Sequence, residues 1–283
     1  MSIYDVIEDR IYNWGCKNDE VLAIYIVGSR ARENKPFDEY SDLDVVVFST
    51  NPDYYLQDSK WLPEIGTVWI DFTFQTVHGD PEKLVLFEQG AQVDFLFQHI
   101  SCLEHSMNSG QIPLGFQRGV KILLDKTENG QRLVPQTKVA PENMPITAEN
   151  YLQTNKMYCF ACLYVGKQIL RDEFWVANQR DKDCKQMLLQ MIEWHAKALN
   201  GETHDTWHAG RFIREWAEKS AIEELKDSFI GFDQESNWKA LISSIELFSR
   251  LSYQVASTYH YAFPAELFSK IQMWLNEHQL IKD

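Results

Sequence analysis

Two short segments near the start of the chain carry residue types that handle phosphate and divalent metal. An apolar run leads into Gly28 and Ser29, and a second apolar run begins with Asp42 and, two residues later, Asp44. If the second run is a strand, both carboxylates leave the same face of the sheet. Mg²⁺ is commonly held by one or two carboxylates together with the phosphate oxygens of a substrate. The pair therefore indicates a metal-dependent phosphate site.

Gly28 and Ser29 suit the phosphate side of such a site. A glycine lets a phosphate approach the backbone because it has no Cβ, and a serine offers a hydroxyl and an N–H to an oxyanion. Neither a Gly-x-x-x-x-Gly-Lys loop nor a Gly-x-Gly-x-x-Gly pattern occurs in the sequence. Their absence argues against P-loop, kinase and dinucleotide-binding folds. The alternative, that Asp42 and Asp44 serve only turn chemistry, is weakened by the Gly-Ser upstream.

A third acid on a later strand would complete the site, and two aspartates compete for this position. Asp94 stands inside the apolar run of residues 93–97, where a carboxylate is unfavourable unless it is paired or binds a metal. Asp71 lies in a similar run. At this level both remain open.

Composition limits the partners and the compartment. The net charge of −14 and the pI near 5.0 have the wrong sign for binding a phosphate backbone, so a nucleic-acid partner is disfavoured. The first residues show no basic and apolar leader, and no uninterrupted apolar run approaches ~20 residues, so we expect no membrane association. Five scattered cysteines fit a reducing compartment. We expect a cytoplasmic protein.

The hydrophobic period changes from 2 to 3.6 near the middle of the chain. Strand-like runs at 22–27, 43–48, 68–75, 92–98 and 119–124, with a helix over 3–14, predict an α+β (α/β-type) first part: a mixed sheet with flanking helices. Helical spacing over 151–170, 185–199, 238–257 and 264–280 predicts an all-α bundle after it. A stretch with three prolines separates the two parts. We expect domains of residues 1–146 and 147–283.

With these residues the sequence resembles the nucleotidyltransferase superfamily, whose hallmark is Gly-Ser, then Asp-x-Asp, then a third acid on a later strand. It is similar in particular to the streptomycin-modifying aminoglycoside 6-adenylyltransferases. The family pattern aligns with Asp94 rather than with Asp71 as the third acid. The longer match consists of Gly28-Ser29-Arg30, Asp42 and Asp44, and the segments at 93–97, 120–126, 164–167 and 170–173.

The resemblance implies roles for further residues. Arg30 and Lys167 would bind the nucleotide, with Lys167 neutralising charge on the departing pyrophosphate. Asp172 and Glu173 would face a cationic acceptor, although charged residues on a helix are usually a solvated face. Trp175, Asp181, Asp183 and Trp194 are further candidates for the acceptor pocket, and nothing in the sequence selects among them.

The predicted activity is transfer of AMP from ATP to a hydroxyl of streptomycin, by resemblance the 6-hydroxyl, with resulting antibiotic resistance. Asp42 and Asp44 would hold Mg²⁺, with Asp94 as general base or as a further metal ligand. Two alternatives stay open: a nucleotidyltransferase with another acceptor, either a protein or a different antibiotic, and a nucleotide-binding regulator without turnover. The intact acid set argues against the regulator.

Overall fold

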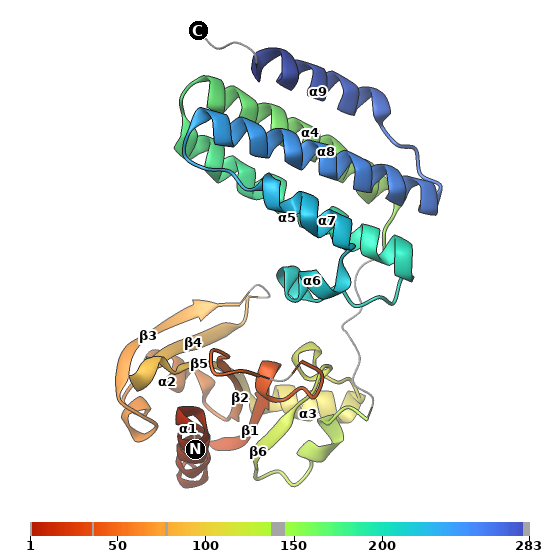
Figure 1. Ribbon diagram of the computed structural model, residues 1–283. Coiled ribbons are helices and arrows are strands. Elements are labelled where there is room, and N and C mark those ends of the chain that lie inside the picture. The colour runs from red at the N-terminus through yellow and green to blue at the C-terminus, as the bar shows by residue number, and fades with distance from the viewer. Residues whose placement is uncertain (1, 36, 77–78, 137–144, 280–283) are drawn as a thin grey trace. The chain divides into compact units, whose positions relative to one another are not determined.

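The computed structural model describes residues 2–35, 37–76, 79–136 and 145–279 (Figure 1). By its internal contacts the chain divides into two compact units, Met1–Glu142 and Asn143–Asp283. The sequence places its boundary a few positions further along, at residue 146. Each unit has its own hydrophobic core.

A mixed sheet forms the centre of the first unit. Its strands are β1 (Val21–Val27), β2 (Leu43–Ser49), β3 (Val68–Gln75), β4 (Pro81–Phe87), β5 (Gln92–His99) and β6 (Lys121–Asp125). Within the described residues their order is β3-β4-β5-β2-β1-β6. β2 and β5 are parallel, and the other neighbouring pairs are antiparallel. The parallel pair brings two segments that are distant in the sequence into one register.

Helices pack on both faces of this sheet. α1 (Ile3–Lys17) begins at a capping box in which Ser2 and Asp5 satisfy each other's backbone N–H groups. Its apolar stripe and α2 (Pro52–Gln57) share a core with the inward residues of β2 and β5. α3 (Ile100–Ser109) packs on the other face, where Leu103 joins the core formed by Tyr25 and Phe48. The helices therefore hold the middle of the sheet rigid.

Strand β4 was not predicted from the sequence. It opens with Pro81, Glu82 and Lys83, which suggest a loop. In the structure Lys83 is buried at 3% exposure, its Nζ donates to the carbonyl oxygen of Leu56 at 3.0 Å, and it lies 3.5 Å from a carboxylate oxygen of Asp71. A buried cation in a strand is tolerated here because it is both hydrogen-bonded and paired with a carboxylate. Lys83 is thus a charged residue at a buried position of β4, where the usual alternation of a strand has an apolar residue.

The second unit is a helical bundle. Its long helices are α4 (Ala148–Leu170), α5 (Phe174–Asn200), α8 (Gln234–Tyr259) and α9 (Ala265–Gln279), with the short α6 (Ile213–Trp216) and α7 (Lys219–Leu225) between them. α5 begins at Phe174 rather than at Lys185, and the predicted end at Leu280 lies outside the described residues. A buried polar cluster links α4 to α8, with Ser252 Oγ donating to Asn155 Oδ1 at 2.6 Å.

The predicted fold class, a mixed sheet with flanking helices followed by an all-α part, is confirmed. In the described part of the chain, every helix is too short or too polar to cross a bilayer.

The Lys83–Asp71 pair gives a first prediction. Asp71→Asn should lower the free energy of unfolding by about 1–3 kcal/mol, because the ammonium group of Lys83 stays buried after its carboxylate partner is removed. Urea unfolding of the full chain measures this. Glu104→Gln, a neutralisation at an exposed position on α3, is the matched control and should leave the stability unchanged. Equal stability of Asp71→Asn and the control would mean that the pair has no structural role.

Candidate active site

Three carboxylates meet where β2 and β5 lie side by side. The parallel register sets Asp44 opposite Asp94, and Asp42 directly precedes the first residue of β2. One oxygen from each carboxylate lies within 4.8 Å of the other two. All three side chains are half-buried, whereas Leu43 between the first two is buried on the other face. Among the residues with described positions, this is the one cluster of three or more side chains suited to a metal ion.

Position 28 requires a glycine because it lies so close to this cluster. Val27 at the end of β1 pairs with Asp44, and Gly28 follows it with a φ of +66°. A Cβ at this position would overlap the Oδ2 atom of Asp44. Both the left-handed backbone and the close approach require glycine. The backbone beside the carboxylates is thus kept free of side-chain bulk.

Ser29 contributes a buried hydroxyl that makes no hydrogen bond within the described residues. The residue is 5% exposed, and within the described structure its Oγ has no hydrogen-bond partner. Buried polar side-chain atoms are nearly always hydrogen-bonded, so an orphaned one calls for an explanation. A hydroxyl next to the carboxylate cluster can donate to a phosphate oxygen. Its position fits the phosphate-binding role expected from the sequence.

Arg30 has a different set of contacts from the one expected of a nucleotide ligand. Its Nε donates to the carbonyl oxygen of Asp42 at 3.2 Å and its Nη2 to that of Ser41 at 3.3 Å. The guanidinium group lies 3.8 Å from the ring centroid of Tyr4 and 4.4 Å from that of Phe37. Arg30 therefore holds the segment that leads into β2 and so positions the first aspartate.

Asp94 is held by its own neighbour on β5. Nε2 of Gln92 donates to the two carboxylate oxygens at 3.1 and 3.3 Å. Burial raises the pKa of Asp94, the hydrogen bond from Gln92 opposes this, and the nearby charge of Asp42 raises it further. The backbone N–H of Gln92 donates to the hydroxyl of Tyr4 at 3.2 Å. A carboxyl with a raised pKa is suited to accept a proton.

The geometry separates the two candidates for the third acid. Asp71 pairs with Val85 on β4, and Val85 pairs with Val93 on β5. Residues opposite each other in neighbouring strands share a face, so Asp71 lies on the face away from Asp94. Its carboxylate accepts from Ser59 Oγ and pairs with Lys83. The structure brings Asp94 to the aspartate pair and leaves Asp71 out.

The other residues expected at the site belong to the second unit. Lys167 is exposed in the last turn of α4, where a cation also suits the helix dipole. Asp172 adopts a left-handed φ of 61° in the turn after α4, a conformation that aspartate tolerates better than most residues. Glu173 is exposed at the N-cap position of α5. Their roles toward nucleotide and acceptor stay predictions.

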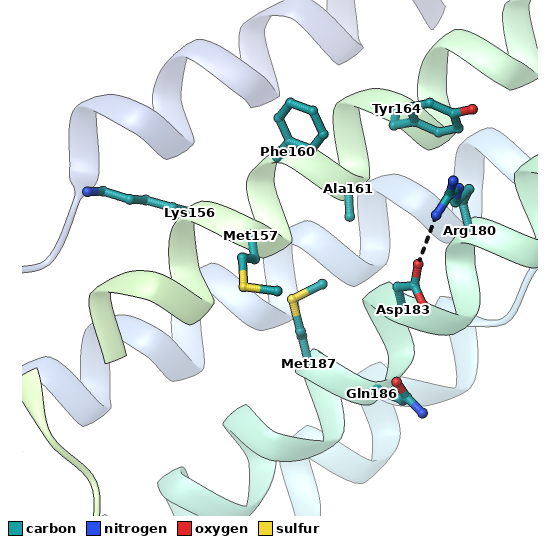
Figure 2. A pocket seen from close by; sticks show the side chains of 9 residues that line it. All are labelled: Lys156, Met157, Phe160, Ala161, Tyr164, Arg180, Asp183, Gln186 and Met187. Atoms are coloured by element: carbon teal, nitrogen blue, oxygen red, sulfur yellow. Dashed lines mark ion pairs between the residues drawn. The ribbon is translucent and has the colours of Figure 1, made fainter. Parts of the chain in front are cut away.

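The second unit also carries a groove of about 640 Å³ between α4 and α5 (Figure 2). Figure 2 shows the side chains of Met157 and Met187 pointing toward one another. Asp183 at this groove pairs with Arg180 at 3.6 Å, and Lys156 adds another cation. The mixture of apolar side chains and cations is a poor match for a polycationic acceptor.

The remaining acceptor candidates differ in their availability. Asp181 is buried and pairs with Lys185 at 2.8 Å, and Trp194 is buried in the core. Trp175 is 70% exposed. Of the four candidates, Trp175 and Asp183 are open to solvent, and the side chain of Asp183 is 55% exposed while it pairs with Arg180.

Sequence comparison assigns the chain to a family. A family model described as streptomycin adenylyltransferase matches residues 1–278. The chain belongs to this family. Two relatives are named aminoglycoside 6-adenylyltransferase. The one from Campylobacter jejuni is 23% identical, over 93% of this chain and 90% of the relative. The one from Bacillus subtilis (strain 168) is 22% identical, over 90% of this chain and 91% of the relative. A solved structure described as an aminoglycoside 6-adenyltransferase from Bacillus subtilis aligns over 97% of both chains with 16% identity and a TM-score of 0.46.

Two residues close to the carboxylate cluster were not singled out in the sequence. Gln92, which binds Asp94, lies two positions before it, so strand spacing was the available signal. Glu82 on β4 is close enough for the charge of Asp94 to raise its pKa, although burial is the larger cause. Finding Glu82 required the strand register, which its sequence surroundings do not reveal.

The contact between Gly28 and Asp44 gives a second prediction. Gly28→Ala should weaken binding of Mg²⁺ and ATP by about tenfold or more, because the new Cβ displaces the Asp44 carboxylate. Gly90→Ala is the control, since Gly90 has a similar φ of +76° but no atom within 4 Å of an added Cβ. Both variants should lose about 1–2 kcal/mol of stability. Calorimetric titration and urea unfolding separate the two effects, and equal nucleotide binding in both variants would contradict the assignment.

Proposed function

We propose that this protein is an adenylyltransferase that transfers AMP from ATP to a hydroxyl group of an aminoglycoside, with the 6-hydroxyl of streptomycin as acceptor. The observation that carries this is the convergence of three carboxylates, Asp42, Asp44 and Asp94, beside the buried hydroxyl of Ser29. Such an arrangement suits a triphosphate bound with a divalent cation. Membership in the streptomycin adenylyltransferase family supports the choice of donor and acceptor.

The donor set fits magnesium. Mg²⁺ prefers oxygen ligands at about 2.0–2.1 Å, so two oxygens on one ion stand up to about 4.2 Å apart. The carboxylate oxygens of Asp42, Asp44 and Asp94 lie within 4.8 Å of one another, and small side-chain rotations close the difference. Bound there, the cation would neutralise phosphate charge and polarise the α-phosphoryl group. Asp42 and Asp44 would be the principal ligands.

The chain's own residues would supply the rest of the chemistry. Gly28 and Ser29 would bind the β- and γ-phosphates through backbone N–H groups and the hydroxyl. Asp94 would take the proton of the acceptor hydroxyl as its oxygen attacks the α-phosphorus, and the bond to the β-phosphate breaks to release pyrophosphate. To the nucleotide contact predicted for Arg30 we add a positioning role for Asp42, since its guanidinium binds two carbonyl oxygens.

The acceptor side of the proposal draws on the second unit. Lys167 would contact the phosphates of ATP, and Asp172 and Glu173 would face cationic groups of the acceptor; all three are exposed and available. The net charge of −14 favours a cationic small molecule over nucleic acid. All five cysteines are free thiols, which supports a reducing, cytoplasmic location.

The proposed function has a direct test. Purified protein should release pyrophosphate from ATP only when Mg²⁺ and streptomycin are both present. Mass spectrometry and NMR of the product then establish adenylylation and its position. Expression in a susceptible bacterium should raise streptomycin resistance. Turnover with a protein or another antibiotic but not with streptomycin would replace the acceptor and keep the transfer chemistry, whereas ATP binding without any turnover would favour a regulator.

A third prediction concerns the aspartate pair. Asp42→Asn and Asp44→Asn should each reduce turnover about 100-fold or more, because a carboxamide is a poor ligand for a hard cation. Stability should be unchanged or higher, since the mutual repulsion of the carboxylates is relieved. Pyrophosphate release across a Mg²⁺ titration, with thermal unfolding in parallel, measures both. Near-normal turnover in either variant would remove it from the metal site.

A fourth prediction separates two roles of Asp94. If Asp94 is the general base, Asp94→Asn should lose about 10²–10⁴ in turnover with nearly unchanged affinity for ATP and Mg²⁺. If it is instead a ligand of the nucleotide-bound metal, the affinity itself should fall. Single-turnover kinetics beside calorimetric titration distinguish these outcomes. A variant with normal binding and normal turnover would exclude Asp94 from the reaction.

A further inference from the structure

The first unit exposes an apolar surface on the same sheet face as the carboxylate cluster. Ile70, Phe72 and Phe74 on β3 are 55%, 51% and 59% exposed. They alternate along the strand and therefore share a face. Across β4 they pair with Leu86, Leu84 and Glu82 in that order. We call Ile70, Phe72, Phe74, Glu82 and Leu84 the β3–β4 face.

The strand register makes this face continuous with the cluster. Phe72 pairs with Leu84, Leu84 pairs with Asp94, and Asp94 pairs with Asp44, so these four side chains form one row across the sheet. Neighbouring strands are about 4.8 Å apart, which sets Phe72 roughly 10 Å from Asp94. This is the length of one or two sugar rings. α1 and α2 pack on the opposite face of the sheet, through the core that contains Val85.

Glu82 gives this surface its charge. It is half-buried and pairs with Leu96 of β5, diagonally next to Asp94. Among the described residues no cation is paired with Glu82, whereas Lys83 beside it is already bound by Asp71. A metal ion at the three aspartates would leave Glu82 as an uncompensated carboxylate. An unpaired, half-buried acid next to exposed aromatic rings is complementary to an organic cation.

We propose that the β3–β4 face binds the acceptor, a cationic carbohydrate, with Glu82 pairing with a guanidinium or ammonium group and Phe72 lying against the ring that carries it. The inference rests on the proposed function and deepens it, because it adds a surface of the first unit to the acceptor contacts proposed for Asp172 and Glu173. The row of paired residues would then direct the acceptor hydroxyl toward Asp94. Glu82 and Phe72 would act on specificity, with no part in proton transfer.

The test compares Michaelis constants for the two substrates in the full-length protein. Glu82→Gln, which keeps the shape and removes the charge, should raise the KM for streptomycin about tenfold or more, because a charge-assisted contact is lost. Phe72→Ala should raise it about three- to tenfold, and Phe72→Leu less. The KM for ATP should stay within about twofold in all three. The salt dependence of the streptomycin KM should weaken in Glu82→Gln.

Matched controls keep these outcomes interpretable. Glu104→Gln removes an exposed carboxylate on α3, and Phe160→Ala removes a ring that is 75% exposed on α4; neither should change the KM for streptomycin. Thermal unfolding shows whether each variant is folded. If Phe72→Ala is unfolded, the KM for streptomycin of Glu82→Gln still tests the proposal.

Three results would overturn the proposal or its basis, and they are distinguishable. An unchanged KM for streptomycin in Glu82→Gln and Phe72→Ala rejects the acceptor surface while leaving the adenylyltransferase proposal intact. A raised KM for ATP alone assigns the face to the nucleotide instead. Absence of pyrophosphate release by the wild-type protein with streptomycin and with a panel of other aminoglycosides rejects the proposed function, and the acceptor surface falls with it.

Discussion

The parallel pairing of β2 with β5 sets Asp44 and Asp94 opposite one another, and the carboxylate cluster of the first unit depends on this register. Two like charges at such a distance repel by about a few kcal/mol at the effective dielectric of a protein surface. The strands keep the pair together because their other faces are locked into an aromatic and aliphatic core that includes Phe95 and Phe97. A cation bound among the three carboxylates would offset this repulsion.

Much of the candidate site could be predicted from short-range patterns in the sequence. The rest depended on the register in which the strands pair. Spacing of two residues placed Asp42 and Asp44 on one face, and the isolation of Asp94 in an apolar run marked it as unusual. Excluding Asp71 required knowing which residues of β4 lie opposite it. The fold class followed from the change of hydrophobic period, whereas β4 was missed because its buried Lys83 breaks that period.

Arg30 shows that a sequence motif does not reveal all of a residue's contacts. The match at Gly28-Ser29-Arg30 implies a nucleotide contact, which stays a prediction, whereas the structure adds two hydrogen bonds from the guanidinium group to carbonyl oxygens before β2. The apolar residues of β3 were likewise read as an ordinary strand, and only the exposure of Phe72 distinguishes surface from core. In the second unit, the groove between α4 and α5 has the wrong chemistry for a polycation. The acceptor is accordingly proposed to bind at carboxylates outside this groove.

Tyr4 connects the two sides of the acid cluster through the first turn of α1. Its ring lies under Arg30, which holds the segment before β2, and its hydroxyl accepts the backbone N–H of Gln92 on β5. Tyr4, two residues after the helix cap at Ser2, therefore helps to position both segments that carry the carboxylates. Loss of the Tyr4 side chain would therefore release two segments at once, the one that leads into β2 and the start of β5.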